Sequence, residues 1–91
     1  MHKIGEAFKY LGTQQQDIVT GCAGVVTSIC FDINGCIQAC LKPPLDKDGK
    51  IPDGYWIDLD RLRERGTPVM KPFPYELPRE YVAGPAEKPA K

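Results

Sequence analysis

The sequence predicts a mainly β fold: a small curled sheet of about five strands, with a short helical turn and an extended proline-rich C-terminal tail. The run from Val25 to Phe31 is rich in β-branched and aromatic residues, which is typical of strands. Asn34-Gly35 follows, a dipeptide that favours hairpins, and a second apolar run extends from Cys36 to Leu41. Because the chain has 91 residues, we expect one domain whose core buries about 60–65% of its unfolded surface.

We expect three parts: an N-terminal extension over residues 1–16, the β domain over 17–70, and a proline-rich tail over 71–91 with a composition at its end that predicts disorder. Apolar residues from Ile4 to Leu11 recur at helical spacing and predict one or two helical turns that end at Gly12. The glutamine run at 14–16 predicts a linker. The first strand is expected over residues 17–20.

The loop of the central hairpin has two candidate lengths. A two-residue turn at Asn34-Gly35 pairs Asp32 with Ile37, whereas a four-residue loop over 32–35 pairs Phe31 with Cys36. The longer loop is favoured because it exposes Asp32. Alternation then predicts an inner face of small and apolar side chains: Val26, Ser28, Cys30, Ile37, Ala39 and Leu41. The outer face is apolar enough to need a cover, and it comprises Val25, Thr27, Ile29, Phe31, Cys36, Gln38 and Cys40.

The second strand of the hairpin ends at Pro43-Pro44, because proline cannot donate to a strand ladder. An exposed polar loop follows as far as Gly54, then a strand over 55–58 and a helical turn over 59–62. Six of the nine prolines lie beyond Gly66, and they favour an extended segment. The side chains expected inside the sheet are Val19, Val26, Cys30, Ala39, Leu41, Trp56 and Leu62.

Composition argues against several classes of function. The 12 basic residues are balanced by 12 acidic ones, which disfavours nucleic acid as a partner. A strip of Arg61, Arg63 and Arg65 keeps a weak nucleic-acid-binding barrel as an alternative, although Glu64 interrupts it. No apolar run approaches the ~20 residues of a membrane span, and the N-terminus lacks the pattern of a secretory signal. We therefore expect a cytoplasmic protein without membrane contact.

No residue pattern indicates catalysis, a cofactor or a bound metal. Asp46-Lys47-Asp48-Gly49 departs from a calcium loop because its glycine comes at the fourth position instead of the sixth. Arginines interleave with the carboxylates of Asp58, Asp60 and Glu64 and neutralise them. The single histidine, His2, lies at a terminus that gives a general base no fixed geometry. Unpaired, metal-free thiols are expected at Cys22, Cys30, Cys36 and Cys40, since no Cys-x-x-Cys pair is present.

Exposed apolar residues instead point to a partner protein. Tyr55 and Trp56 are candidates to line a groove for proline-rich peptides, and Trp56 alternatively packs in the core. The outer face and the tail together predict a homo-oligomer, with a dimer favoured, and the tail packs either on its own chain or on a second one. The expected partner-binding residues are Val25, Ile29, Phe31, Tyr55, Trp56, Phe73 and Tyr75.

From Asp17 to Met70, the order of strand, glycine turn, long hairpin, loop, short strand and helical turn resembles an SH3-like barrel. This span is also similar to a group of small proteins of phages, prophages and other mobile elements, integron cassettes included. The residues that carry the likeness are Asp17–Gly21, Gly24–Thr27, Gly35-Cys36, Asp46–Lys50, Trp56–Asp58, Arg61-Leu62, Pro68–Met70 and Gly84–Pro89. Cys22 departs from the group, in which an aromatic residue is expected.

The resemblance implies a protein of a mobile genetic element but brings no activity with it. The expected function is a non-enzymatic protein-binding or assembly module that self-associates. A small oligomeric enzyme with an active site between subunits is the alternative, because a trimethoprim-resistant dihydrofolate reductase resembles this fold. The Gln-Ile-Tyr pattern of that enzyme is absent here, and Trp56-Ile57-Asp58 occupies the comparable strand.

Overall fold

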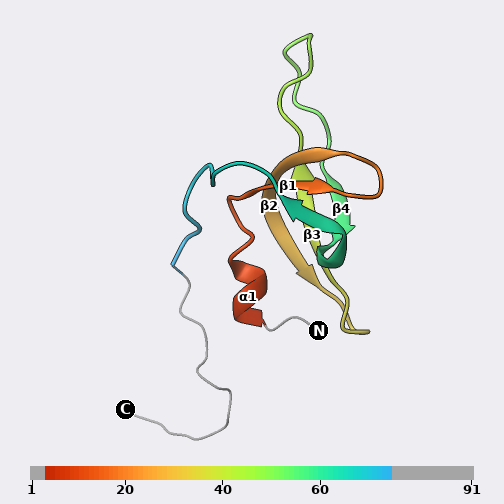
Figure 1. The fold of residues 1–91 in the computed structure, drawn as a ribbon, viewed down its shortest axis with the longest axis vertical. Helices are drawn as coiled ribbons and strands as arrows, with labels where there is room; N and C mark the ends of the chain where they lie inside the picture. Colours follow the sequence, from red (N-terminus) through yellow and green to blue (C-terminus); the bar gives the residue numbers. More distant parts are fainter. Residues whose placement is uncertain (1–3, 75–91) are drawn as a thin grey trace, which may run out of the picture.

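A computed structural model of the chain describes residues 4–74. Figure 1 shows a mainly β protein, which confirms the predicted class. Five strands form one small sheet, and a short α-helix and a 3₁₀ turn are the helical elements of the described residues. The elements in chain order are α1 (Ile4–Phe8), β1 (Gln14–Asp17), β2 (Ala23–Phe31), β3 (Ile37–Lys42), β4 (Tyr55–Asp58), the 3₁₀ turn η1 (Leu59–Arg61) and β5 (Leu62–Glu64). Predictions for residues 75–91 lie outside the described residues. In the described part, no helix has the length and apolar character needed to cross a membrane.

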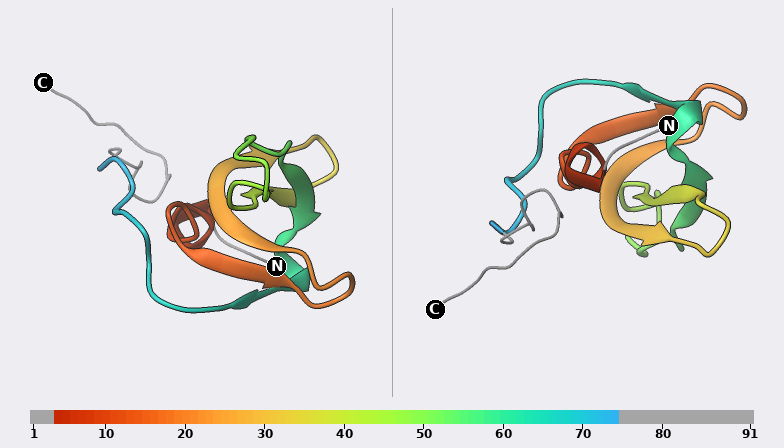
Figure 2. Two further views of the ribbon diagram at one scale, coloured as in Figure 1. Left: turned by 90° about the horizontal axis from the view of Figure 1, so that it is seen from above. Right: turned by 90° about the horizontal axis from the view of Figure 1, so that it is seen from below.

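The sheet is antiparallel throughout and has the strand order β4-β3-β2-β1-β5. Its two edge strands, β4 and β5, are joined in sequence by the three residues of η1. In a flat sheet these strands would lie roughly 19 Å apart, whereas three residues of 3₁₀ helix span roughly 6 Å. The sheet must therefore curl until its edges approach each other, as the end-on views show (Figure 2).

Strand β2 is shared between two hairpins and bends at Thr27. The register with β3 shifts between Val26 and Ser28, so Thr27 is an extra residue in β2. Beyond this bulge the alternation is reversed, and Ile29 and Phe31 pair with Ala39 and Ile37. The predicted pairing of Phe31 with Cys36 is therefore wrong. Ile29 and Phe31 lie on the inner face of the sheet, while Ser28 and Cys30 lie on the outer face.

Two loops share one geometry. In the β2–β3 loop, Asp32 Oδ1 accepts hydrogen bonds from the backbone N–H groups of Asn34 (2.8 Å) and Cys36 (2.9 Å). Asp46 Oδ1 accepts the equivalent bonds from Asp48 (2.8 Å) and Lys50 (2.9 Å), at the tip of the long loop that projects between β3 and β4 (Figure 1). Each loop has the pattern Asp-x-Asx-Gly, with the glycine at positive φ. The hairpin loop therefore holds five residues, 32–36, and not four.

The core is small, as expected for this length. Its buried apolar residues are Ala7, Val26, Ala39, Leu41, Ile57 and Leu59. Of the side chains predicted inside, Val26, Ala39 and Leu41 are buried and Leu62 is half-buried. The prediction is wrong for Cys30, which is exposed, for Val19, which is 67% exposed, and for Trp56, which is 51% exposed.

Strand β1 contains the glutamine run that the sequence suggested as a linker, together with Asp17. The predicted first strand over 17–20 is wrong, because residues 18–20 form a turn. Gln15 and Asp17 point into the domain and are buried, with exposed fractions of 5% and 0%. The Gln15 side chain donates to Thr13 Oγ1 (3.0 Å), while Gln14 and Gln16 donate to the carbonyls of Thr67 (2.7 Å) and Gly21 (3.1 Å). The backbone of this polar strand is paired in the sheet, and its side-chain amides bind residues outside the strands.

Candidate functional site

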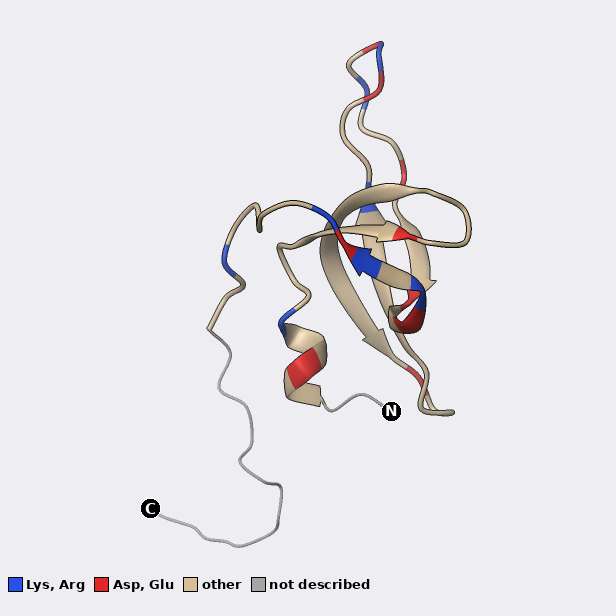
Figure 3. Ribbon diagram, viewed as in Figure 1, with Lys and Arg blue, Asp and Glu red and all other residues tan. Residues whose placement is uncertain are grey.

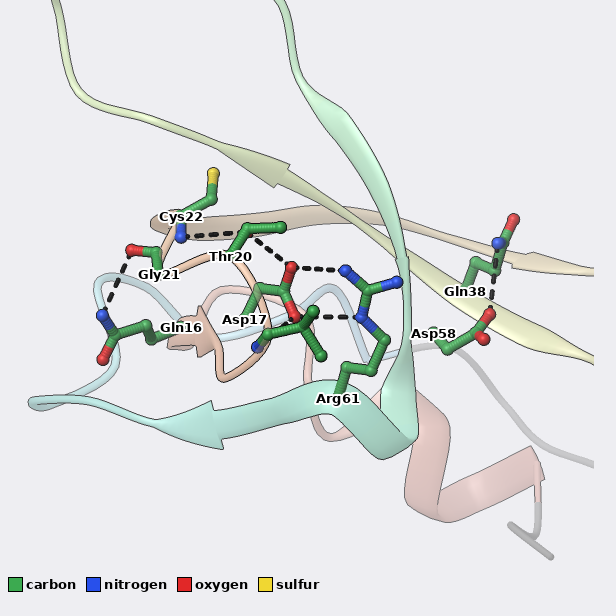
Figure 4. A network of polar contacts seen from close by, with 9 residues as sticks. Gln16, Asp17, Thr20, Gly21, Cys22, Gln38, Asp58 and Arg61 are labelled. Carbon is green, nitrogen blue, oxygen red and sulfur yellow. Dashed lines mark hydrogen bonds and ion pairs between the residues drawn. The ribbon is translucent and has the colours of Figure 1, made fainter.

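An ion pair joins the end of β1 to the end of η1. The Asp17 carboxylate accepts two hydrogen bonds from the Arg61 guanidinium, from Nε to Oδ1 at 3.0 Å and from Nη2 to Oδ2 at 2.7 Å (Figure 4). The Asp17 side chain is 1% exposed and that of Arg61 is 40% exposed. Two parallel N–H···O bonds fix the guanidinium in one plane, so this pair sets the position of η1 against β1.

The turn that follows β1 is organised around the same carboxylate. Thr20 Oγ1 donates to Asp17 Oδ2 (2.7 Å), and the backbone N–H of Val19 donates to Oδ1 (3.1 Å). Thr20 Oγ1 also accepts from the N–H of Cys22 (3.2 Å). Ile18–Cys22 is therefore a braced turn, which explains why Val19 points away from the core.

These contacts determine the charge state of the pair. The Arg61 hydrogen bonds, aided by Thr20 and Val19, hold the pKa of Asp17 far below its ordinary value although burial acts in the opposite direction. The same hydrogen bonds raise the pKa of Arg61. Both groups are charged near neutral pH.

An open pocket of about 410 Å³ lies beside this ion pair. The lining residues come from the end of β1, the following turn, β4 and η1, and they are Asp17, Thr20, Cys22, Tyr55, Trp56, Ile57 and Arg61. Tyr55 to Ile57 are consecutive strand residues, whose side chains alternate between the two faces of the sheet. Since all three line the pocket, the pocket follows the edge of β4.

The edge of β4 is unpaired in the described part of the chain, because β4 pairs with β3 alone. In an antiparallel edge strand, alternate residues direct their N–H and C=O groups away from the sheet. The pocket therefore combines backbone donors and acceptors with two aromatic side chains, Tyr55 and Trp56, that are 54% and 51% exposed. Such a surface suits an extended polypeptide better than a small polar molecule.

Charges around the pocket are mixed in sign. Acidic and basic residues are interspersed along η1 and β5, where Asp60, Arg61, Arg63 and Glu64 follow one another closely (Figure 3). No group of three or more His, Cys, Asp or Glu side chains among residues 4–74 is placed to hold a metal ion. The four cysteines are unpaired, with Cys22 in the pocket lining.

Only two of the predicted partner-binding residues line this pocket, Tyr55 and Trp56. Ile29 packs against the core and Val25 is half-buried. The Phe31 ring packs on Phe8 of α1, with a centroid separation of 6.2 Å and an interplanar angle of 45°. The sequence placed Ile29 and Phe31 on an outer face that needs a cover, but both lie on the inner face, where the helix α1 of the same chain contacts Phe31. Phe73 is 68% exposed in the tail, and Tyr75 lies outside the described residues.

Sequence reasoning missed the other five pocket residues, which are Asp17, Thr20, Cys22, Ile57 and Arg61. A signal was present in Asp17-Ile18-Val19-Thr20-Gly21, since an aspartate followed by threonine and glycine at these spacings favours a turn closed by side-chain hydrogen bonds. The turn was not predicted, because the β-branched pair Ile18-Val19 favours a strand. No family model matches this sequence, and comparisons with curated proteins and solved structures gave no similar protein.

Proposed function

We propose that the protein is a non-enzymatic protein-binding module that holds an extended, proline-containing segment in the pocket along β4. The observation that carries the proposal is the pair of half-exposed aromatic rings, Tyr55 and Trp56, beside an unpaired strand edge. Self-association, action in the cytoplasm and origin in a mobile genetic element belong to the same proposal, and the resemblance to small proteins of mobile elements supports the origin.

Proline-containing segments fit this pocket for three reasons. Their extended helix is formed before binding, so less conformational entropy is lost when they dock. Proline rings pack well on the faces of aromatic side chains, as in other grooves that read such segments. Their carbonyl groups accept hydrogen bonds, and the indole N–H of Trp56 and the N–H groups of Arg61 that do not face Asp17 are suitable donors.

The charge state of the ion pair supports binding over catalysis. A general base works best when its pKa lies near the operating pH. Asp17 is held ionised by Arg61 and Thr20, and its lowered pKa makes it a weak base. The guanidinium of Arg61 is in turn engaged by a carboxylate, which weakens it as a phosphate ligand for nucleic acid.

Tryptophan fluorescence tests the proposal, because Trp56 is the single tryptophan of the chain. Addition of decaproline is expected to shift the Trp56 emission in a saturable way, with micromolar affinity. A Gly-Ser peptide of equal length is the matched ligand control, and it should leave the emission unchanged. Tyr55→Ala should weaken the response, whereas Ile51→Ala, at an exposed apolar residue of the β3–β4 loop, should not. Equal responses to both peptides, or none to either, would refute the proposal.

A further inference from the structure

The free edge of β4 presents the backbone groups of alternate residues, and the β2–β3 loop shows which ones. In this loop the N–H of Asp32 donates to the carbonyl of Cys36 (3.1 Å). Cys36 therefore directs its backbone groups toward β2, and so do the even-numbered residues of β3, since hydrogen bonds alternate along an antiparallel strand. The odd-numbered residues of β3, Ala39 among them, direct their N–H and C=O groups toward β4.

The pairing of β3 with β4 extends this pattern to the edge. Ala39 pairs with Ile57, so Ile57 and Tyr55, two positions before it, form hydrogen bonds with β3. Trp56 lies between them and directs its N–H and C=O groups away from the sheet, and Asp58 does the same. Among the described residues, β4 pairs with β3 alone. Trp56 thus offers one backbone donor and one backbone acceptor along the pocket that it lines.

From this geometry we infer that the pocket binds its ligand as an added antiparallel strand with one ligand residue opposite Trp56, an inference that rests on the proposed function. This ligand residue keeps a backbone N–H group, because the C=O of Trp56 needs a donor. The ligand residues before and after it direct their N–H groups away from β4, so proline fits at both positions. The ligand is therefore an extended segment in which prolines alternate with residues that can donate a backbone hydrogen bond.

The two faces of β4 determine where the side chains of such a ligand lie. Tyr55 and Ile57 lie on the inner face of the sheet, as their partners in β3 do, and Trp56 lies on the outer face. Toward the added strand, Tyr55 and Ile57 occupy the non-hydrogen-bonded positions, at which side chains of two strands approach most closely. The two prolines thus pack on the Tyr55 ring and beside Ile57, while the middle residue packs next to Trp56.

Asp58 adds a preference for a basic residue in the ligand. Its carboxylate accepts a hydrogen bond from the neutral amide of Gln38 (3.2 Å; Figure 4). Asp17 and Arg61 neutralise each other, so Asp58 leaves a net negative charge among the residues that line the pocket or form β4. In an antiparallel ligand, the residue two positions before the one opposite Trp56 lies opposite Asp58. A lysine or arginine at that position is complementary in charge.

A peptide with a blocked backbone amide tests this mode of binding. The parent peptide is acetyl-Gly-Arg-Pro-Val-Pro-Gly-amide, in which the valine is placed opposite Trp56 and the arginine opposite Asp58. The matched control peptide contains N-methylvaline, which lacks the N–H group and keeps the side chain. In titrations followed by Trp56 fluorescence, the parent peptide should bind at least about tenfold more tightly than the control, because the control leaves one hydrogen bond unmade.

Hydrogen exchange identifies the edge residue that the peptide engages. The Ile57 amide should be protected already in the free protein, because it bonds to β3. The Trp56 amide faces the open edge, and saturating parent peptide should slow its exchange at least about tenfold. Asp58→Asn should weaken the parent peptide about threefold. Asp48→Asn, at an exposed residue of the β3–β4 loop, is the matched control and should bind like wild type.

Equal affinities for the parent and the N-methylated peptide, or unchanged exchange at Trp56, would overturn the inference. An unchanged affinity of Asp58→Asn would show that the preference for a basic residue is wrong. If decaproline still shifts the Trp56 emission in either case, the proposed function stands and only the mode of binding is wrong. If neither decaproline nor the parent peptide binds, the proposed function fails as well.

Discussion

The Asp17 carboxylate and the Arg61 guanidinium, 44 residues apart in sequence, form two hydrogen bonds of 3.0 and 2.7 Å in one plane. Asp17 ends β1, and Arg61 ends the turn that carries the chain from one edge of the sheet to the other. The pair therefore fixes the curl of the sheet. It also forms part of the pocket lining, so fold and candidate site depend on the same contact.

Replacement of Asp17 by asparagine should destabilise the protein. The change removes the charge that Arg61 faces and leaves the guanidinium beside a neutral amide in a half-buried position. Thermal unfolding followed by circular dichroism should show a melting temperature lower by on the order of 10 °C. Asp53→Asn is the matched control, because Asp53 is an exposed residue of the β3–β4 loop, and it should melt within a degree or two of wild type.

The same carboxylate makes stability depend on pH in a defined direction. The folded-state pKa of Asp17 lies well below the ~3.9 of an unfolded aspartate, so folding favours the ionised form. Its stabilisation is complete above about pH 5 and is lost as the pH falls toward the folded-state pKa. The difference in melting temperature between wild type and Asp17→Asn, measured from about pH 7 to pH 2, should therefore narrow steadily below about pH 4. A constant difference over that range would show that Asp17 does not supply the effect.

Alanine substitutions at two glycines with the same φ angle distinguish the cost of backbone strain from the cost of a steric clash. Gly12 and Gly21 both have φ of 82°, which disfavours any residue with a side chain. A Cβ at Gly12 would collide with the carbonyl oxygen of Met70, whereas a Cβ at Gly21 would meet no atom within 4 Å. Gly21→Ala should lower the free energy of unfolding by about 1 kcal/mol. Gly12→Ala should lower it further and break the hydrogen bonds that the N–H groups of Val69 and Met70 donate to the Gly12 carbonyl. Urea unfolding measures the difference, and equal losses would show that the tail does not pack on Gly12.

Leu41 and Leu45 provide a matched pair for the core. Leu41 is completely buried among the inner-face residues, while Leu45 is 61% exposed in the β3–β4 loop. Leu41→Ala is expected to lower the free energy of unfolding by about 2–5 kcal/mol, and Leu45→Ala by about 0.5 kcal/mol or less. Similar effects for the two changes in urea unfolding would mean that the inner face does not form the core.

The sequence predicted the class of fold because its strongest signals are local. The Asn34-Gly35 hairpin, the prolines at 43 and 44, and the strand that leads into a helical turn after Tyr55 all depend on residues near one another in the chain. The bulge at Thr27 has no such signal, since it lies just beyond the residues at which β2 pairs with β1 while the pairing with β3 continues. That single extra residue moved Ile29 and Phe31 to the inner face and invalidated the predicted outer face.

The candidate site was only half predictable for a similar reason. Tyr55 and Trp56 stand out as adjacent aromatic residues before a turn, and the structure places both at the pocket. Asp17 and Arg61 look like ordinary surface charges in sequence. Their proximity results from the curl of the sheet, which brings the end of β1 to the end of η1. A polar strand such as Gln14–Asp17 also carries none of the apolar alternation by which strands are recognised.

The most direct test of the proposal that the pocket along β4 binds peptides is an NMR titration of ¹⁵N-labelled protein with decaproline. The backbone amides of Thr20, Cys22, Trp56 and Ile57, together with the indole N–H of Trp56, should shift in a saturable way. The amides of Asp48 and Gly49, at the tip of the β3–β4 loop, should stay in place. Saturable shifts confined to the pocket residues are the predicted result. Shifts centred elsewhere on the sheet, or none at all at millimolar peptide, would contradict the assignment of this pocket as a peptide-binding site.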